Sequence, residues 1–195
     1  MNEGKIVARC IGTAPLLMHS ARTVNPFDPI TRRMREITSK RVKTDEDKEL
    51  LARLEWEAGL YHDADVGPYI PALMIEATLR NAAKLSRNGR NVQRGLLVTD
   101  DVVPLEYDGP RDIAGLFADE HGRYISMMPV RVGMARVMRC RPIFRDWAIQ
   151  FTAILDESIL GFDDFVRIAE QAGSQIGFGD NRPRFGRFSI EIGRL

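Results

Sequence analysis

The chain of 195 residues has only two cysteines, Cys10 and Cys140, which excludes a disulfide framework and a cysteine-rich zinc site. No apolar run approaches the roughly 18 residues of a membrane span, and the first residues lack the apolar core of a signal peptide. Gly-Lys-Ser and Gly-Lys-Thr do not occur, which excludes a Walker phosphate loop. We therefore expect a soluble, cytoplasmic protein without a cofactor or metal, built as a single domain over residues 1–195.

Lysine is also scarce: 5 of the 28 basic residues are lysine and 23 are arginine, and the net charge is +1. Guanidinium groups bind phosphate as forked donors and stack on bases. The acids concentrate at 45–65 and 100–120, whereas the basic residues form three separate segments. These are Arg80, Lys84, Arg87, Arg90 and Arg94; then Arg131, Arg136, Arg139, Arg141 and Arg145; and finally Arg182, Arg184 and Arg187. A near-neutral chain patterned in this way can carry one basic face.

Hydrophobic periodicity predicts strands at 5–11 and 184–192 and helices at 72–86 and 162–172. Two further strands, 129–139 and 147–155, are predicted to form a hairpin joined near 141–146. Thr44 caps a predicted acidic helix that ends near Gly59, and 87–91 reads as a basic turn.

This order of elements predicts an α+β fold, namely an RRM-like or ferredoxin-like antiparallel sheet with two helices. The segments at about 30–65, which is helical and acidic, and 95–125 are then insertions into that sheet.

The strongest local motif is Gly173-x3-Gly177-x-Gly179-x2-Arg182-x-Arg184-x-Gly186-Arg187, between a predicted helix and the last strand. Glycines permit positive φ and close backbone approach, so that successive amides can point at one anion. The arginines add forked phosphate donors. The alternative is a helix stop followed by a tight turn, in which glycine is common for conformational reasons alone.

This C-terminal segment resembles the glycine-rich loop of the RAMP superfamily, the RRM-like RNA-binding proteins of CRISPR systems. Leu16-Leu17-Met18-His19-Ser20 is similar to the turn after the first strand in backbone subunits of effector complexes. The segment Asp65–Arg80, whose Tyr69-Ile70-Pro71 opens the predicted helix 72–86, and the segment Phe27-Asp28-Pro29-Ile30-Thr31 are similar to two further family segments, in the family's order. Ala72–Ala77 replaces the family's polar helix start, as expected of a distant relative such as a phage-encoded one.

The resemblance implies a subunit that binds single-stranded RNA and assembles side by side along it, as a homo-oligomer or in a ribonucleoprotein complex. Gly177, Gly179, Arg182, Arg184 and Arg187 then hold phosphates. The list of expected contacts continues with Arg80, Lys84, Arg87, Arg90, Arg94, Arg131, Arg136 and Arg139. Phe144 and Trp147 lie beside the second segment, where interleaved aromatics suit stacking on unpaired bases, although a core position is the alternative for Trp147. The residues leave RNA and DNA equally open as ligands.

Two other functions remain open. His19 follows the first strand, as does a catalytic histidine in RAMP-like ribonucleases, and an imidazole with a near-neutral pKa suits a general base for metal-independent RNA cleavage. A turn histidine is the alternative. Asp28 is a candidate for metal-dependent cleavage by the same resemblance, or a turn-capping residue. Finally, the acidic segments and the low net charge fit a protein–protein interaction module that kept the fold without the binding site.

Overall fold

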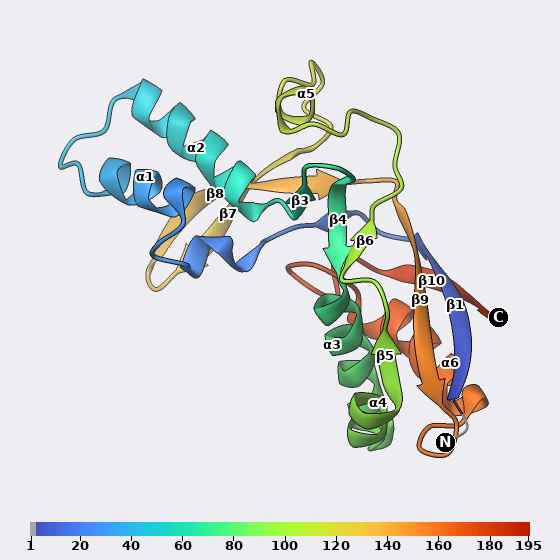
Figure 1. Ribbon diagram of the computed structural model, residues 1–195. Coiled ribbons are helices and arrows are strands. Elements are labelled where there is room, and N and C mark those ends of the chain that lie inside the picture. Colours follow the sequence, from blue (N-terminus) through green and yellow to red (C-terminus); the bar gives the residue numbers. More distant parts are fainter. Residues whose placement is uncertain (1–2) are drawn as a thin grey trace.

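The computed structural model describes the backbone of residues 3–195 and the side chains of these residues other than Glu3 and Val132. The protein is α+β with antiparallel sheets and is laid out in two lobes (Figure 1). The sheet lobe comprises β1 (Glu3–Gly12), α3 (Ala72–Ala83), α4 (Gly89–Gly95), β5 (Leu96–Val98), β9 (Ala148–Asp156), α6 (Phe162–Gln171) and β10 (Phe188–Arg194). The hairpin lobe comprises β2 (Leu16–Leu17), the 3-10 turn η1 (Ala21–Val24), α1 (Pro29–Thr38), α2 (Asp45–Gly59), β7 (Ile125–Val132) and β8 (Ala135–Phe144).

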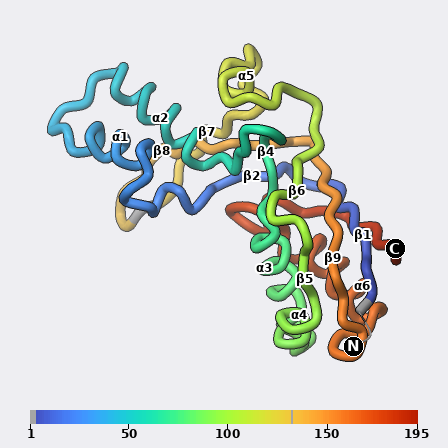
Figure 2. Tube along the Cα trace, in the orientation of Figure 1, coloured from blue at the N-terminus to red at the C-terminus, as the bar shows by residue number. Residues whose placement is uncertain are grey.

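The chain passes between the lobes several times (Figure 2). It leaves the sheet lobe after β1, builds α1 and α2, and returns through β3 (His62–Asp63) and β4 (Gly67–Pro71). After β6 (Val102–Pro104) it leaves again for α5 (Ile113–Phe117), β7 and β8 before entering β9. β3, β4 and β6 form a small antiparallel sheet at the junction of the lobes.

The sheet lobe has the strand order β10-β1-β9-β5, and every neighbouring pair is antiparallel. In β1, the buried side chains of Ile6, Ala8 and Cys10 alternate with more exposed ones, as a sheet covered on one face requires. α3 contacts β5, α6 contacts β10, and the two helices contact each other. Together they bury one face of the sheet, and the predicted strand 5–11 and helices 72–86 and 162–172 are confirmed as parts of this unit.

The predicted hairpin between 129–139 and 147–155 is wrong. β8 pairs with β7, and the tight turn between them is made possible by Gly133, whose φ is +59°. The chain instead changes sheets after Phe144, and β9 pairs with β1 and β5. Trp147 fixes this change of direction, because its buried indole Nε1 donates a 2.9 Å hydrogen bond to the carbonyl of Ala14.

The segment 30–65 is helical as expected, but only its second half is acidic. Thr44 and Asp47 form a capping box at the start of α2, which carries three acids in its first turn. α1 instead begins at Asp28-Pro29 and is basic on its solvent side, with Arg32, Arg33 and Arg35 exposed. The basic turn predicted at 87–91 continues into the short helix α4, and the last strand begins at Phe188 instead of residue 184.

A continuous buried cluster joins the two lobes. It includes Trp56 in α2, Phe144 in β8 and Ile149 in β9. The indole Nε1 of Trp56 donates to the carbonyl of Tyr124, 2.9 Å away, which ties α2 to the start of β7. β5 belongs to the main sheet, so the segment inserted between β5 and β9 starts after Val98 and contains β7 and β8.

Candidate nucleic-acid interface

The glycine-rich loop lies on the side of α3 that faces the hairpin lobe (Figure 1). Gly177, Gly179 and Gly186 all have positive φ, between 74° and 80°. A Cβ on Gly186 would lie 1.9 Å from the carbonyl oxygen of Phe178, and one on Gly179 would lie 2.3 Å from that of Leu17. The loop therefore needs glycine both for its backbone conformation and for its close packing.

The amides of these glycines are already occupied within the protein. Gly177 N–H donates to the carbonyl of Ala172 at 2.8 Å, and Gly186 N–H donates to that of Pro15 at 2.8 Å. Gly179 N–H points at the sulfur of Met74, 3.4 Å away in α3. The expected cradle of free glycine amides is therefore absent at these three positions, and any anion here must be held by side chains.

The three arginines of the loop do extend into solvent. Arg182, Arg184 and Arg187 are exposed, and among the described side chains none of them pairs with an acid. Their internal hydrogen bonds go to backbone carbonyls: Arg187 Nε donates to Pro183 at 2.8 Å, and Arg182 donates to Gly177 at 3.5 Å. The loop thus presents three guanidinium groups that none of the described carboxylates neutralises through an ion pair.

A second basic surface covers α3, α4 and the 3-10 turn η2 (Lys84–Ser86) between them. Arg80, Lys84, Arg87 and Arg90 line one shallow cavity of about 440 Å³. Arg94 is exposed on the last turn of α4. The first expected basic segment is therefore brought together on one surface.

The second surface adjoins the glycine-rich loop. Lys84 Nζ donates to Oδ1 of Asn81 at 2.8 Å, and Asn81 lines a further cavity of about 510 Å³ together with Asn181 and Arg182. One turn earlier in α3, the hydroxyl of Thr78 lies 3.5 Å from the carbonyl of Gly177. α3 thus connects the basic residues of one surface to those of the other.

On its other side the loop touches the hairpin lobe. Asp180, which lines the same cavity as Arg182, forms an ion pair with Arg141 of β8. Asp180 N–H also donates to the carbonyl of Leu17 at 2.8 Å, which fixes the position of this carboxylate. The basic surface at 80–94, the loop at 182–187 and Arg141 of β8 thus follow one another along one path, whereas Arg145 lies apart and lines another cavity with Tyr107 and Arg123.

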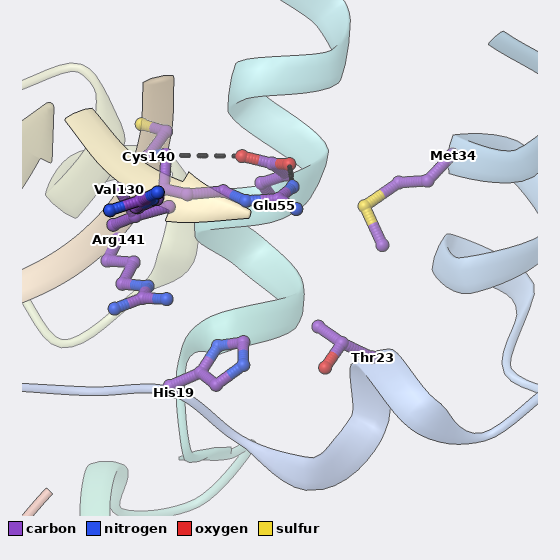
Figure 3. Close-up of a pocket in the computed structure, with 9 residues that line it drawn as sticks. His19, Thr23, Met34, Glu55, Val130, Cys140 and Arg141 are labelled. Atoms are coloured by element: carbon purple, nitrogen blue, oxygen red, sulfur yellow. Dashed lines mark hydrogen bonds and ion pairs between the residues drawn. The ribbon is translucent and has the colours of Figure 1, made fainter. Parts of the chain in front are cut away.

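Beyond Arg141 the path enters a cleft of about 480 Å³ between the hairpin and α1. Figure 3 shows His19 and Thr23 on one side of the cleft, Met34 of α1 on another, and Glu55 and Arg141 toward the hairpin. The remaining lining residues are Val130, Arg131, Arg139 and Cys140. Three guanidinium groups and one carboxylate make this cleft positively charged overall.

His19 lies at the mouth of this cleft, exposed on one side and enclosed by protein on the other. Partial burial, followed by the positive charge of Arg141, lowers the pKa of His19 below its ordinary 6.5. Asp180 and Glu55 oppose this shift without reversing it. The imidazole is therefore neutral at pH 7 and able to accept a proton.

The arginines of the hairpin are not equivalent to those of the loop. Arg139 pairs with Glu55 of α2, whose second carboxylate oxygen accepts from the amide of Cys140 at 3.3 Å. Arg131 and Arg136 are exposed and stand directly opposite each other near the turn of the hairpin. Like charges in this cross-strand position destabilise a hairpin unless an anion lies between them.

The aromatic residues considered for base stacking are unavailable. Trp147 is 4% exposed and Phe144 is 1% exposed, so both belong to the core, as the alternative for Trp147 predicted. Asp28 is the N-cap of α1, since its Oδ1 accepts from the amides of Ile30 and Thr31. This capping accounts for its position without a metal.

Sequence reasoning overlooked the basic side of the hairpin lobe. Between residues 30 and 43 the sequence holds one acid, Glu36, and a run of basic residues that could have been found as a charge run. These basic residues are Arg32, Arg33, Arg35, Lys40, Arg41 and Lys43. Met34 brings α1 to the rim of the cleft, so the exposed Arg32, Arg33 and Arg35 of this helix lie near the path described above.

Within the described residues, no three histidine, cysteine or acidic side chains are grouped as a metal site would require. Over the same part of the chain, none of the helices is both long and apolar enough to cross a membrane. The searches for relatives found no protein-family model that matches the chain and no curated protein that matches it.

Proposed function

We propose that this protein binds single-stranded nucleic acid, and RNA in preference to DNA, along the path from α4 over the glycine-rich loop to the cleft at His19. The observation that carries the proposal is the position of Arg182, Arg184 and Arg187, which are exposed, unpaired with the described acids, and flanked on both sides by further basic surfaces. Contacts of this kind bind the phosphate backbone and therefore give affinity without sequence preference.

A ferredoxin-like fold and a distant relationship to the RAMP superfamily are part of this proposal. The strand order β10-β1-β9-β5 supports it, with α3 between β1 and β5 in the chain and α6 between β9 and β10. The face of the sheet away from the helices carries Lys5, Arg9 and Gln150 and offers no exposed aromatic for the stacking that RRM domains use. The helical side and the loop are therefore the better candidates for contact.

The family habit of side-by-side assembly along the strand, as a homo-oligomer or ribonucleoprotein subunit, also enters as a proposal. Its physical support is the opposite charge of two exposed regions of the chain. The outer side of α1 is basic, whereas the first turn of α2 carries Asp45, Glu46 and Asp47. Complementary patches of this kind can steer two copies toward each other.

The test is polarisation binding of a labelled single-stranded RNA and of the DNA with the same sequence, at two salt concentrations. Wild type is compared with the triple variant Arg182→Ala/Arg184→Ala/Arg187→Ala. The matched control is Arg9→Ala/Arg167→Ala/Arg194→Ala, which removes the same charge from residues that line none of the three cavities described above. Products are then examined on a denaturing gel.

We expect salt-dependent binding that the loop variant loses and the control variant keeps, with the RNA intact. Tighter binding of RNA than of DNA would support the choice of RNA. Failure of the folded wild type to bind either strand contradicts the proposal and leaves a protein–protein interaction module as the best account of the fold.

Cleavage of RNA is a second candidate function, favoured by the surroundings of His19. A neutral imidazole at pH 7 can take the proton of a 2′-hydroxyl, and Arg131 and Arg141 in the same cleft can stabilise the negative charge that develops on the phosphate. The test is cleavage of labelled RNA in EDTA by wild type and by His19→Ala. Cleavage by wild type alone supports this function, whereas intact RNA with both proteins rejects it.

A further inference from the structure

Phe27 is the one aromatic side chain among the described residues that is exposed, at 75% of its surface. It lies in the short loop between η1 and α1, outside every segment that the sequence identified as binding nucleic acid. Single exposed apolar residues are common on proteins and carry no meaning alone. What distinguishes Phe27 from such residues is the fixed turn, the arginines and the cleft that lie close to it.

The backbone on both sides of Phe27 is fixed. Its amide donates to Oδ1 of Asn25 at 3.0 Å, and the next residue, Asp28, caps α1. Arg22 Nε donates to Oδ2 of Asp28 at 3.0 Å. Burial alone would raise the pKa of Asp28, but the hydrogen bonds from Arg22 and Thr31 outweigh it and lower the pKa, so this carboxylate stays charged. The ring of Phe27 is thus presented to solvent from a preorganised turn.

One guanidinium group lies over the ring, and the helix that carries it is basic. The guanidinium carbon of Arg32 lies 5.8 Å from its centroid, and Arg32 Nε donates to the carbonyl of Pro26 at 3.4 Å. Arg33 and Arg35 are exposed on the same helix. An exposed aromatic ring next to a basic helix can stack an unpaired base while arginines of that helix hold the neighbouring phosphates.

The loop of Phe27 is also continuous with the nucleic-acid path. η1 precedes the loop and supplies Thr23 to the cleft, and α1 follows it and supplies Met34 to the same cleft. The hydroxyl of Thr31 donates to the carbonyl of Arg22 at 2.9 Å, which holds the two segments together. A strand that leaves the cleft past Thr23 and Met34 therefore reaches the surface on which Phe27 lies.

From this arrangement we propose that Phe27 is a stacking platform for one unpaired base, and that Arg32, Arg33 and Arg35 bind the phosphates next to it. This inference rests on the proposed function and extends the binding path by a subsite at which a base, and not only the backbone, is contacted. A membrane surface would be attracted by the same charges and is treated as the competing outcome of the test.

The experiment compares wild type with Phe27→Ala, Phe27→Trp and the control Val24→Ala, which removes a side chain that is 76% exposed three residues earlier. Because both side chains are exposed, these variants are expected to fold, and thermal melting checks this. The probes are a single-stranded RNA, the same chain with abasic residues throughout, and vesicles of anionic lipid. Affinity is measured by polarisation, and the added indole of Phe27→Trp is followed by its fluorescence.

We expect Phe27→Ala to bind the RNA about tenfold more weakly, as the loss of one stacked base predicts. The abasic chain should bind wild type and Phe27→Ala equally, the indole of Phe27→Trp should be quenched by RNA, and Val24→Ala should behave as wild type. Unchanged RNA affinity of Phe27→Ala, with wild type binding well, overturns the inference and leaves the proposed function standing. An indole that responds to vesicles and not to RNA overturns it in favour of a membrane surface. Absence of RNA binding by wild type defeats the proposed function itself.

Discussion

The arginines of the glycine-rich loop and those of strand β8 are neighbours, because Asp180 of the loop forms an ion pair with Arg141 of β8. The two groups differ in whether an acid of the protein already neutralises their charge. Arg182, Arg184 and Arg187 extend into solvent and form no ion pair with a described acid. Arg139 and Arg141 are less exposed and are each paired, with Glu55 and with Asp180. A paired arginine must exchange a carboxylate for a phosphate, whereas an unpaired one gains a partner outright.

Two clusters of the same residue type can therefore contribute unequally to binding. Sequence composition counts both equally, because the acids that neutralise Arg139 and Arg141 lie 84 and 39 residues away in the chain. Within the loop, the backbone and the side chains also differ. The glycines determine the shape of the loop and their amides are bonded within the protein, so it is the exposed arginine side chains that are available to bind a ligand.

The largest effect is expected from the backbone of the loop. Gly186→Ala places a Cβ 1.9 Å from the carbonyl oxygen of Phe178 at a φ of +74°, and we expect a loss of about 3 kcal/mol of unfolding free energy. Gly193→Ala in β10 is the control, since its Cβ would meet only Val7 at an ordinary 3.6 Å. Chemical denaturation measures both. A Gly186→Ala protein as stable as wild type but impaired in RNA binding would show that this glycine serves the ligand and not the shape of the loop.

The next effect separates free from paired arginines. Removing Arg182, Arg184 and Arg187 should lower the slope of log affinity against log salt by about 2, from roughly 0.7 for each phosphate contact on a single strand. Arg139→Ala/Arg141→Ala should lower it by less than about 1, because these charges are already largely compensated. Salt titrations of RNA binding give both slopes, and equal losses per arginine would remove the distinction between the clusters.

Releasing the paired arginines should have a smaller effect of opposite sign. Asp180→Asn and Glu55→Gln each free one guanidinium group, and we expect RNA affinity to rise about two- to fivefold for each, the range that a partly exposed ion pair supports. Asp164→Asn is the control, because it frees Arg167 on α6, outside the path. If all three variants bind equally well, net charge alone accounts for the change and the pairs have no specific role.

Local signals identified most elements of the sheet lobe and helix α2 of the hairpin lobe. The alternation in β1, the capping box of α2 and the amphipathic pattern of α6 depend on neighbouring residues, and each predicted the right element. Strand pairing was beyond these signals. The predicted strand 129–139 contains the turn at Gly133, so it combines the end of β7 with the start of β8, and Trp147 anchors the chain after β8 in the other sheet.

For the candidate site as well, local features could be predicted from the sequence and contacts between distant residues could not. The three basic segments could be found as charge runs, but their contiguity arises from contacts such as Lys84 with Asn81 and Asp180 with Arg141. The basic side of α1 was missed because the segment 30–65 was predicted to be acidic as a whole, although Asp28-Pro29 is a typical helix start and Ile30, Met34 and Ile37 recur at helical spacing. Phe27 was missed for a similar reason, because the exposure of an aromatic side chain depends on the folded structure and not on the local sequence.

The smallest expected effect is on the pH dependence of stability, through His19. The pKa of His19 depends on how completely Asp180 and Glu55 neutralise the arginines of β8. Partial burial and then Arg141 lower the pKa of His19 from 6.5. Within the range in which histidine titrates, the unfolded chain therefore binds more protons at this residue than the folded one, so its contribution makes stability fall as the pH drops through 6.5 toward the lowered pKa, and stability is independent of this residue only well above 6.5. The variant His19→Asn should lose less thermal stability than wild type between about pH 7.5 and pH 5.5, where histidine titrates. In an Arg141→Gln background this difference should shrink, because one cause of the shift is gone. A difference between wild type and His19→Asn that is the same in both backgrounds would mean that Asp180 already neutralises Arg141 completely, and that burial and the other charges around the cleft account for the lowered pKa.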